Sequence, residues 1–144
     1  MTEQVYAYAL RLLQRRDYTI DELRTKLSAK FGAVPEGVLE QLTQKDFLND
    51  RRFAENYVAK RRKRGPVALR DEMLARGVAT GLVDEILGQA EWPSLREAVA
   101  AKIKTWKLRS PLQSRDAARL FRALVRLGYD EDAILEEIEQ IPKR

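Results

Sequence analysis

Cysteine and histidine are both absent from the 144-residue sequence. The lack of cysteine excludes disulfide bonds, thiolate zinc sites and thiol nucleophiles, and it is compatible with a reducing cytosol. The lack of histidine removes the commonest metal ligand and general base. A glycine-rich phosphate-binding loop with its lysine and hydroxyl residue is missing as well. We therefore predict a protein that is not an enzyme and that binds no metal or cofactor.

Long apolar runs are also missing, because no segment approaches the roughly 20 apolar residues that span a bilayer. The first residues, Met1 to Leu13, lack the basic stretch followed by an apolar stretch that marks a secretory signal. A basic amphipathic helix on a membrane surface is disfavoured, since the apolar positions match internal packing. These features predict a cytoplasmic protein without a membrane partner.

Glycine and proline are few, at 7 and 5 residues, whereas the strong helix formers Leu, Ala, Glu, Arg and Lys dominate. Apolar residues recur at helical spacing throughout the chain. The sequence therefore predicts an all-α fold with nine amphipathic helices. Their apolar faces lie, in order, within Val5–Leu13, Leu23–Phe31, Val38–Leu42, Phe53–Val58, Leu69–Leu74, Leu82–Leu87, Leu95–Trp106, Ala117–Val125 and Ile134–Ile138.

Several of these helices have recognisable starts. Thr19 with Glu22, and Ser94 with Glu97, are capping boxes, in which each side chain binds a backbone N–H group of the other residue. Pro35 suits a first helical position. Other start signals are Asn49 or Asp50, of which Asp50 is the favoured N-cap, and Asp130.

Three glycines, Gly32, Gly77 and Gly128, are each predicted to end a helix, and they relate the helices to one another. Apolar residues lie six and ten positions after each glycine, and in the second and third sets also eight and four positions before it. The first set matches before its glycine only if one residue is inserted near Phe31. This register predicts three tandem three-helix repeats that form an elongated, curved molecule. Their expected bounds are 1–47, 48–91 and 92–144. The alternative is that unrelated amphipathic helices align by chance.

The strongest charge feature is the basic run Lys60, Arg61, Arg62, Lys63 and Arg64, in a chain with a net charge of +5. Cations at a helix end complement the helix dipole, but this run is longer than that role needs. We therefore predict contacts with phosphate or with an acidic protein surface.

Other cations extend this candidate surface. Arg51 and Arg52 begin a helix, where cations oppose the dipole, so a binding face is one explanation for them. Lys102, Lys104, Arg115 and Arg119 are further candidates, with Arg122 and Arg126 on the same helical face as the last two. A solvated face is the equal alternative for this third group.

Trp106 and Tyr57 could stack on bases of a single strand, but such aromatic residues more often belong to the core. Acidic residues gather in the last helix of each predicted repeat, for example at Glu36, Asp84 and Glu136. The sequence thus predicts basic and acidic faces on one molecule.

Several segments carry a resemblance to a known family. They are Tyr6–Leu13 (YAYALRLL), followed by Glu22–Leu27 (ELRTKL), and Leu48–Val58 (LNDRRFAENYV), with Gly65-Pro66 and Arg76-Gly77-Val78 beyond them. They resemble the RecX family, which regulates RecA recombinase. Phe31 and the triplet Leu127-Gly128-Tyr129 depart from the family pattern.

The resemblance implies three tandem three-helix repeats. It also implies that the protein binds along a RecA filament on single- or double-stranded DNA and inhibits strand exchange and ATP hydrolysis, with a role in DNA repair, recombination and the SOS response. We expect it to act as a monomer. The alternative is a transcription regulator that binds DNA without RecA through a helix-turn-helix between Thr19 and Leu42.

Overall fold

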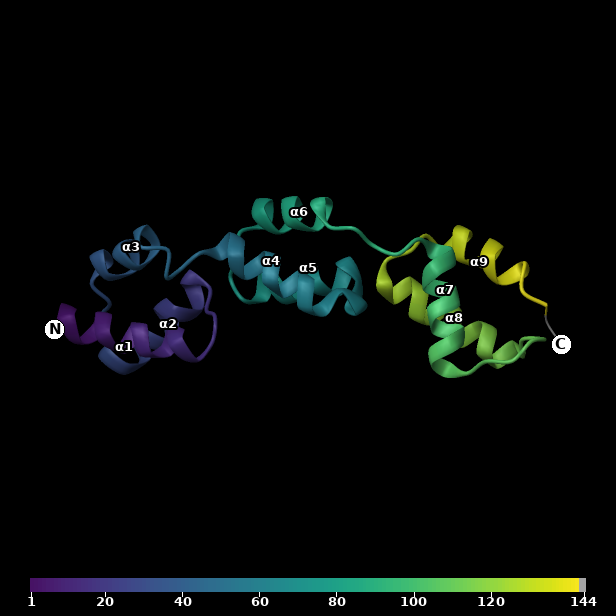
Figure 1. Cartoon of the computed structure of the whole chain (residues 1–144), viewed down its shortest axis with the longest axis horizontal. Coiled ribbons are helices and arrows are strands. Elements are labelled where there is room, and N and C mark those ends of the chain that lie inside the picture. Colours follow the sequence, from purple (N-terminus) through teal and green to yellow (C-terminus); the bar gives the residue numbers. More distant parts are fainter. Residues whose placement is uncertain (143–144) are drawn as a thin grey trace. The chain divides into compact units, whose positions relative to one another are not determined.

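A computed structural model of the chain describes residues 1–142 (Figure 1). Within this range it contains nine α-helices, one short 3-10 helix and no strand, so the predicted all-α fold is confirmed. The helices are α1 (Thr2–Arg15), α2 (Ile20–Phe31), α3 (Glu36–Gln44), α4 (Asp50–Arg61), η1 (Arg62–Arg64), α5 (Gly65–Ala75), α6 (Thr80–Gln89), α7 (Leu95–Trp106), α8 (Ser114–Leu127) and α9 (Glu131–Glu139).

Both predicted capping boxes are confirmed. The Thr19 side chain accepts from the Glu22 backbone N–H at 3.0 Å, and the Glu22 carboxylate accepts from the Thr19 N–H at 3.1 Å. Ser94 and Glu97 form the same pair of bonds at the start of α7. These bonds satisfy N–H groups that have no partner inside the helix.

The three predicted glycine breaks all adopt positive φ angles, 82° at Gly32, 91° at Gly77 and 101° at Gly128. The left-handed region is accessible to glycine without a Cβ clash, which explains why the helices end there. The apolar positions that define the glycine register are all buried: Val38, Leu42, Leu69, Met73, Val83, Leu87, Leu120, Leu124, Ile134 and Ile138.

The chain divides into two compact units. One consists of Met1–Lys60 and Arg70–Gln89, and the other combines Arg61–Leu69 with the chain from Ala90 onward. Helix α5 thus contributes residues to both. The repeat boundaries expected near residues 47 and 91 stay a prediction from the glycine register.

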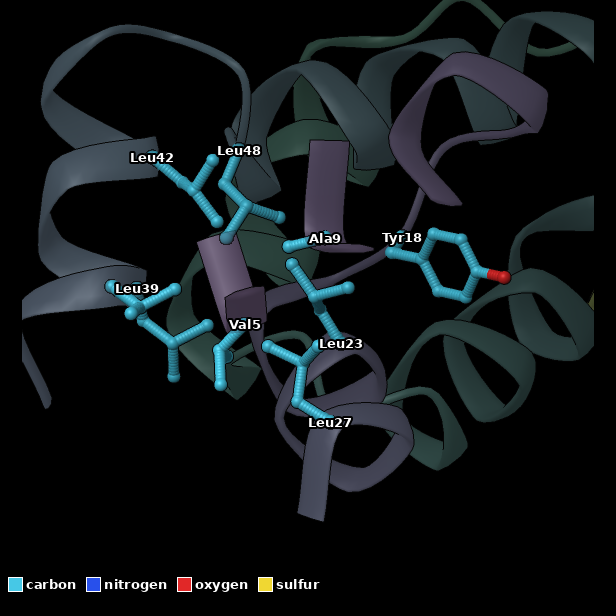
Figure 2. Close-up of a cluster of buried hydrophobic side chains, with 9 residues drawn as sticks. Val5, Ala9, Tyr18, Leu23, Leu27, Leu39, Leu42 and Leu48 are labelled. Carbon is cyan, nitrogen blue, oxygen red and sulfur yellow. The ribbon is translucent and has the colours of Figure 1, made fainter. Parts of the chain in front are cut away.

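In the first unit, α1, α2 and α3 enclose an apolar cluster (Figure 2). Val5 and Ala9 of α1 are fully buried, and so are Leu23 and Leu27 of α2. Figure 2 shows their side chains meeting those of α3 in one cluster. Burying a leucine side chain stabilises the fold by about 1.5 to 3 kcal/mol, so this cluster holds the three helices together.

In the second unit, α7, α8 and α9 pack side by side around a separate cluster (Figure 1). Leu120 and Leu124 of α8 are fully buried against Ile134 of α9. Trp106 packs at the edge of this cluster and stays partly exposed. The periodicity therefore predicted the centre of this core correctly, whereas Leu112, which is also buried in it, lies outside the expected apolar faces.

Two predicted helix starts need correction. Pro35 is the residue before α3 and has extended backbone angles, so it is the N-cap and not the first helical residue. At α4 the cap is Asn49, whose side chain accepts from the Arg52 N–H at 3.0 Å. Asp50 is the first residue of α4, and its carboxylate instead accepts from the backbone N–H of Ile20, at the start of α2, at 2.9 Å.

Candidate nucleic-acid interface

The basic run lies across the end of α4. Lys60 and Arg61 are the last two residues of α4, and the last three residues of the run form η1, so α4 ends inside the run. Lys60, Arg62 and Lys63 have exposed side chains. Three of the five cations, Arg62, Lys63 and Arg64, therefore lie on a tight turn, the basic turn, and the other two lie just before it in α4.

Gly65, the residue directly after this turn, packs closely against Leu127 within the second unit. Its φ is 81°, and a Cβ atom there would lie 2.9 Å from the carbonyl oxygen of Leu127. Gly128 makes the reciprocal approach, because a Cβ atom on it would lie 2.7 Å from Cγ2 of Val67. The chain that follows Arg62–Arg64 thus packs closely against the C-terminal end of α8.

A cavity of about 250 Å³ opens beside this turn, also within the second unit. Three of the predicted cations, Arg62, Lys63 and Lys102, contribute to its lining. Its aromatic walls are Trp92 and Tyr129. The structure therefore brings together cations that lie about forty residues apart in the sequence.

The Tyr129 side chain is held in place by a hydrogen bond. Its hydroxyl donates to the carbonyl oxygen of Pro93 at 2.6 Å. Burial, together with the nearby Glu97 carboxylate, raises the pKa of Tyr129 above its usual range. The phenol accordingly stays protonated at neutral pH and remains a donor.

Trp106 connects two predicted cations. The Arg119 guanidinium lies 3.7 Å from the centre of the indole ring, and the Lys102 ammonium lies 5.3 Å from it. Such cation–π contacts stabilise by about 0.5 to 1 kcal/mol at exposed sites. They hold the Lys102 and Arg119 side chains near each other on α7 and α8.

The other two cations predicted with Lys102 and Arg119, which are Lys104 and Arg115, do not line the cavity beside the basic turn. Arg115 lines a second hollow of about 500 Å³ together with Lys107 and Arg109. Lys104 is exposed on α7 and lines neither of the two cavities.

Arg51 and Arg52, both in the first unit, have partners within the fold. Arg51 pairs with Glu85 of α6 at 2.6 Å, and both side chains are nearly half exposed. Arg52 donates to the Asp46 carboxylate at 3.0 Å and to backbone oxygens of Asp46 and Phe47. Because exposed ion pairs contribute at most about 1 kcal/mol, Glu85 leaves Arg51 able to exchange its partner for a phosphate. Arg52 holds the connection between α3 and α4.

Tyr57 is part of the core and does not offer a stacking surface. It is only 4% exposed, and its hydroxyl bonds to the Glu72 carboxylate at 2.6 Å. Among residues 1–142, no cluster of acidic side chains could hold a metal ion. No helix in the same range combines the length and apolar character that a membrane-spanning helix needs.

Comparison with known proteins identifies the family. The family model "RecX, second three-helix domain" matches residues 49–87. The chain is 39% identical to the regulatory protein RecX of Halorhodospira halophila over 138 residues, which cover 92% of this chain and 85% of the relative. It is also 39% identical to a regulatory protein RecX of Thermus thermophilus, over 94% of this chain and 91% of that protein.

The chain belongs to the RecX family.

Solved structures agree on the fold of this RecX family member. The crystal structure of RecX from Lactobacillus salivarius matches with a TM-score of 0.75 at 18% identity, over 97% of both chains. The relatives carry the name of a regulatory protein and not that of an enzyme. The match at residues 49–87 lies inside the predicted second repeat.

Sequence reasoning missed several residues at the candidate interface. Trp92 and Tyr129 line the cavity beside the basic turn, but they lie outside any charged pattern. In the first unit, the Tyr8 ring has the Lys30 ammonium 4.5 Å from its centre and the Arg11 guanidinium at 5.7 Å. The interleaving of aromatic residues with cations was a signal available in the sequence, but spacing alone could not pair residues from different helices.

Proposed function

We propose that this protein binds the RecA filament on DNA and inhibits strand exchange and ATP hydrolysis by RecA. It acts by binding, without catalysis of its own, as a monomer in the cytoplasm. Through this inhibition it modulates recombinational DNA repair and the SOS response. The observation that carries the proposal is the similarity to regulatory proteins RecX along nearly the whole chain.

The distribution of cations supports DNA as one component of the target. Arg62 and Lys63 expose positive charge on η1, and Lys60 exposes it at the end of α4. Each phosphate that such side chains neutralise releases counterions. Lys102 and Arg119 supply positive charge on the helices of the second unit.

Acidic side chains support a protein component. The exposed residues of α9 include Glu131, Asp132, Glu136 and Glu139, which would repel phosphate. A partner with both phosphate and basic protein surface, such as a protein filament on DNA, suits a molecule that carries both signs of charge. We propose that the protein docks along neighbouring RecA subunits and favours a conformation that hydrolyses ATP poorly.

The test is the DNA-dependent ATPase activity of RecA, with this protein added after the filament has formed on single strands. We expect inhibition at near-stoichiometric amounts, because the target is the assembled filament. Excess free single-stranded DNA should leave much of the inhibition in place, which separates filament binding from removal of DNA. Full RecA activity in the presence of the folded, DNA-binding protein would contradict the proposal.

The helix-turn-helix alternative has less support from the surface of its second helix. Helix α3 exposes Glu36 and Glu40 and buries Val38, Leu39 and Leu42. An acidic helix face is repelled by the phosphates that flank the major groove. We therefore favour the filament regulator over a transcription regulator that uses this segment.

A further inference from the structure

We propose that the cavity beside the basic turn takes one unstacked base of single-stranded DNA. The inference rests on the DNA component of the proposed function but not on RecA. It concerns the second unit alone, where all the lining residues lie.

The walls of the cavity suit a flat aromatic ring. Trp92 and Tyr129 provide two aromatic side chains, and the Tyr129 ring is fixed by its hydrogen bond to Pro93. A base gains about 1 to 3 kcal/mol from stacking on a protein aromatic ring, and any base can do so. A wall that is already held in position loses little conformational entropy when the base enters.

The rim of the cavity suits the phosphates on either side of such a base. Arg62, Lys63 and Lys102 all contribute to the lining, whereas none of the lining residues that the structure describes is acidic. This combination of aromatic walls and cations is the usual composition of single-strand binding surfaces. An acidic peptide with an apolar side chain would match the charge but would use the aromatic walls less fully.

The size of the cavity limits the occupant. At about 250 Å³ it lies below the roughly 300 Å³ at which pockets for drug-sized ligands begin, so it has room for a single ring system. A base inside a duplex is paired and stacked, and it enters a pocket only after the cost of flipping it out. The cavity should therefore favour single strands over duplex.

Two neighbouring alanines on α7 provide a matched pair of variants. Ala100 and Ala101 are both exposed, but only Ala101 contributes to the lining. Ala101→Leu would fill part of the cavity without a change in charge, and Ala100→Leu adds the same side chain outside it. Circular dichroism would establish that both variants keep the wild-type helix content.

The experiment measures binding by fluorescence anisotropy without RecA. We expect Ala101→Leu to weaken binding to oligothymidylate by about 5- to 150-fold, the range that corresponds to one lost base stack. Its binding to duplex, and to an oligonucleotide with abasic sites, should stay within about twofold of wild type. Ala100→Leu should leave all three affinities unchanged.

A loss shared equally by oligothymidylate, abasic oligonucleotide and duplex would overturn the proposal, and so would unchanged binding of oligothymidylate by Ala101→Leu. An acidic peptide that binds wild type but not Ala101→Leu, with oligothymidylate binding unaffected, would assign the cavity to a protein partner instead. These results are independent of the RecA ATPase test, so either hypothesis can fail alone.

A second measurement needs no variant. An oligothymidylate that carries one 4-thiothymidine can be crosslinked to the wild-type protein by light, and the modified peptide can be identified by mass spectrometry. We expect the crosslink on the peptides that contain Trp92 or Tyr129. Crosslinks confined to other parts of the chain would contradict the assignment.

Discussion

Thr19 donates a hydrogen bond from its hydroxyl to the backbone carbonyl oxygen of Arg76, at 2.6 Å and across 57 residues of sequence. The same hydroxyl accepts from the Glu22 N–H at the start of α2, and Thr19 is completely buried. One side chain thus caps a helix and satisfies the carbonyl of a residue just beyond α5. Both partners lie in the first unit.

We predict that Thr19→Val destabilises the fold by about 2 to 4 kcal/mol, because it leaves a buried N–H and a carbonyl oxygen without their partner. Thr19→Ser keeps the hydroxyl and should lose only about 1 kcal/mol for the missing methyl group. Urea denaturation followed by circular dichroism measures both. Equal unfolding midpoints for the two variants would refute the double role of the hydroxyl.

Asp50 leads to a prediction on pH. Burial raises the pKa of Asp50 above 3.8, partly opposed by the hydrogen bond from the Ile20 N–H, and Asp21 and Glu22 raise it further. The folded chain therefore binds this proton more tightly than the unfolded chain does. Between the unfolded and the folded pKa, the contribution of Asp50 to stability consequently falls as pH rises.

Asp50→Asn keeps an acceptor for Ile20 and removes the charge. We expect this variant to be more stable than wild type at neutral pH, with the difference shrinking as pH falls toward 3.8. Asp50→Ala loses the acceptor as well and should cost about 1 kcal/mol relative to Asn. Denaturation curves over this pH range test both points, and a gap between wild type and Asn that widens in acid would contradict the pKa direction.

The close approach at Gly128 predicts a steric conflict. Gly128→Ala places a Cβ atom at a φ of 101° and 2.7 Å from Cγ2 of Val67. A left-handed conformation alone costs a residue with a side chain about 1 to 2 kcal/mol, so the total loss should exceed 1 kcal/mol. Val67→Ala in the same chain should recover part of it, which a double-mutant cycle measures.

Gly81→Ala is the control, since Gly81 has no positive φ and a Cβ atom added to it would meet no atom within 4 Å. That substitution should stabilise the chain by about 0.5 kcal/mol. If Gly81→Ala and Gly128→Ala lost similar stability, contact with Val67 would not be the cause of the loss at Gly128.

The basic turn predicts a change in salt dependence. Replacing Arg62 and Lys63 by Gln should lower the log–log salt slope of duplex binding by up to about 1.8, or about 0.9 for each phosphate contact. Arg61 and Arg64 stay in place, because each interacts with other groups of the protein. Fluorescence anisotropy at several salt concentrations gives the slope.

The matched control replaces Arg15 and Lys26, which are exposed on α1 and α2, and removes the same charge outside the turn. If the two double variants have the same slope, the turn has no special part in DNA binding.

Local signals explain why much of the fold was predictable. A capping box spans four residues, and a glycine break depends on one φ angle, so Thr19, Ser94 and Gly128 could be interpreted without knowledge of the tertiary structure. The buried positions of α8 followed in the same way from helical spacing.

The missed features depend on contacts between distant segments. Asp50 has the residue type and position of a cap for its own helix, but it binds Ile20, 30 residues away. Arg62 lines the same cavity as Trp92 and Tyr129 because Gly65 packs against Leu127. A contact between two distant segments of this kind leaves no periodic pattern in the sequence. The candidate interface was therefore predicted as a set of cations, without the aromatic cavity beside them.

The close packing of Gly128 against Val67 has an evolutionary consequence. Val67 fills the space beside Gly128, so a residue with a side chain at position 128 requires a smaller residue at position 67. Selection would act on this pair jointly, so positions 67 and 128 should covary among relatives even though about 60 residues of sequence separate them.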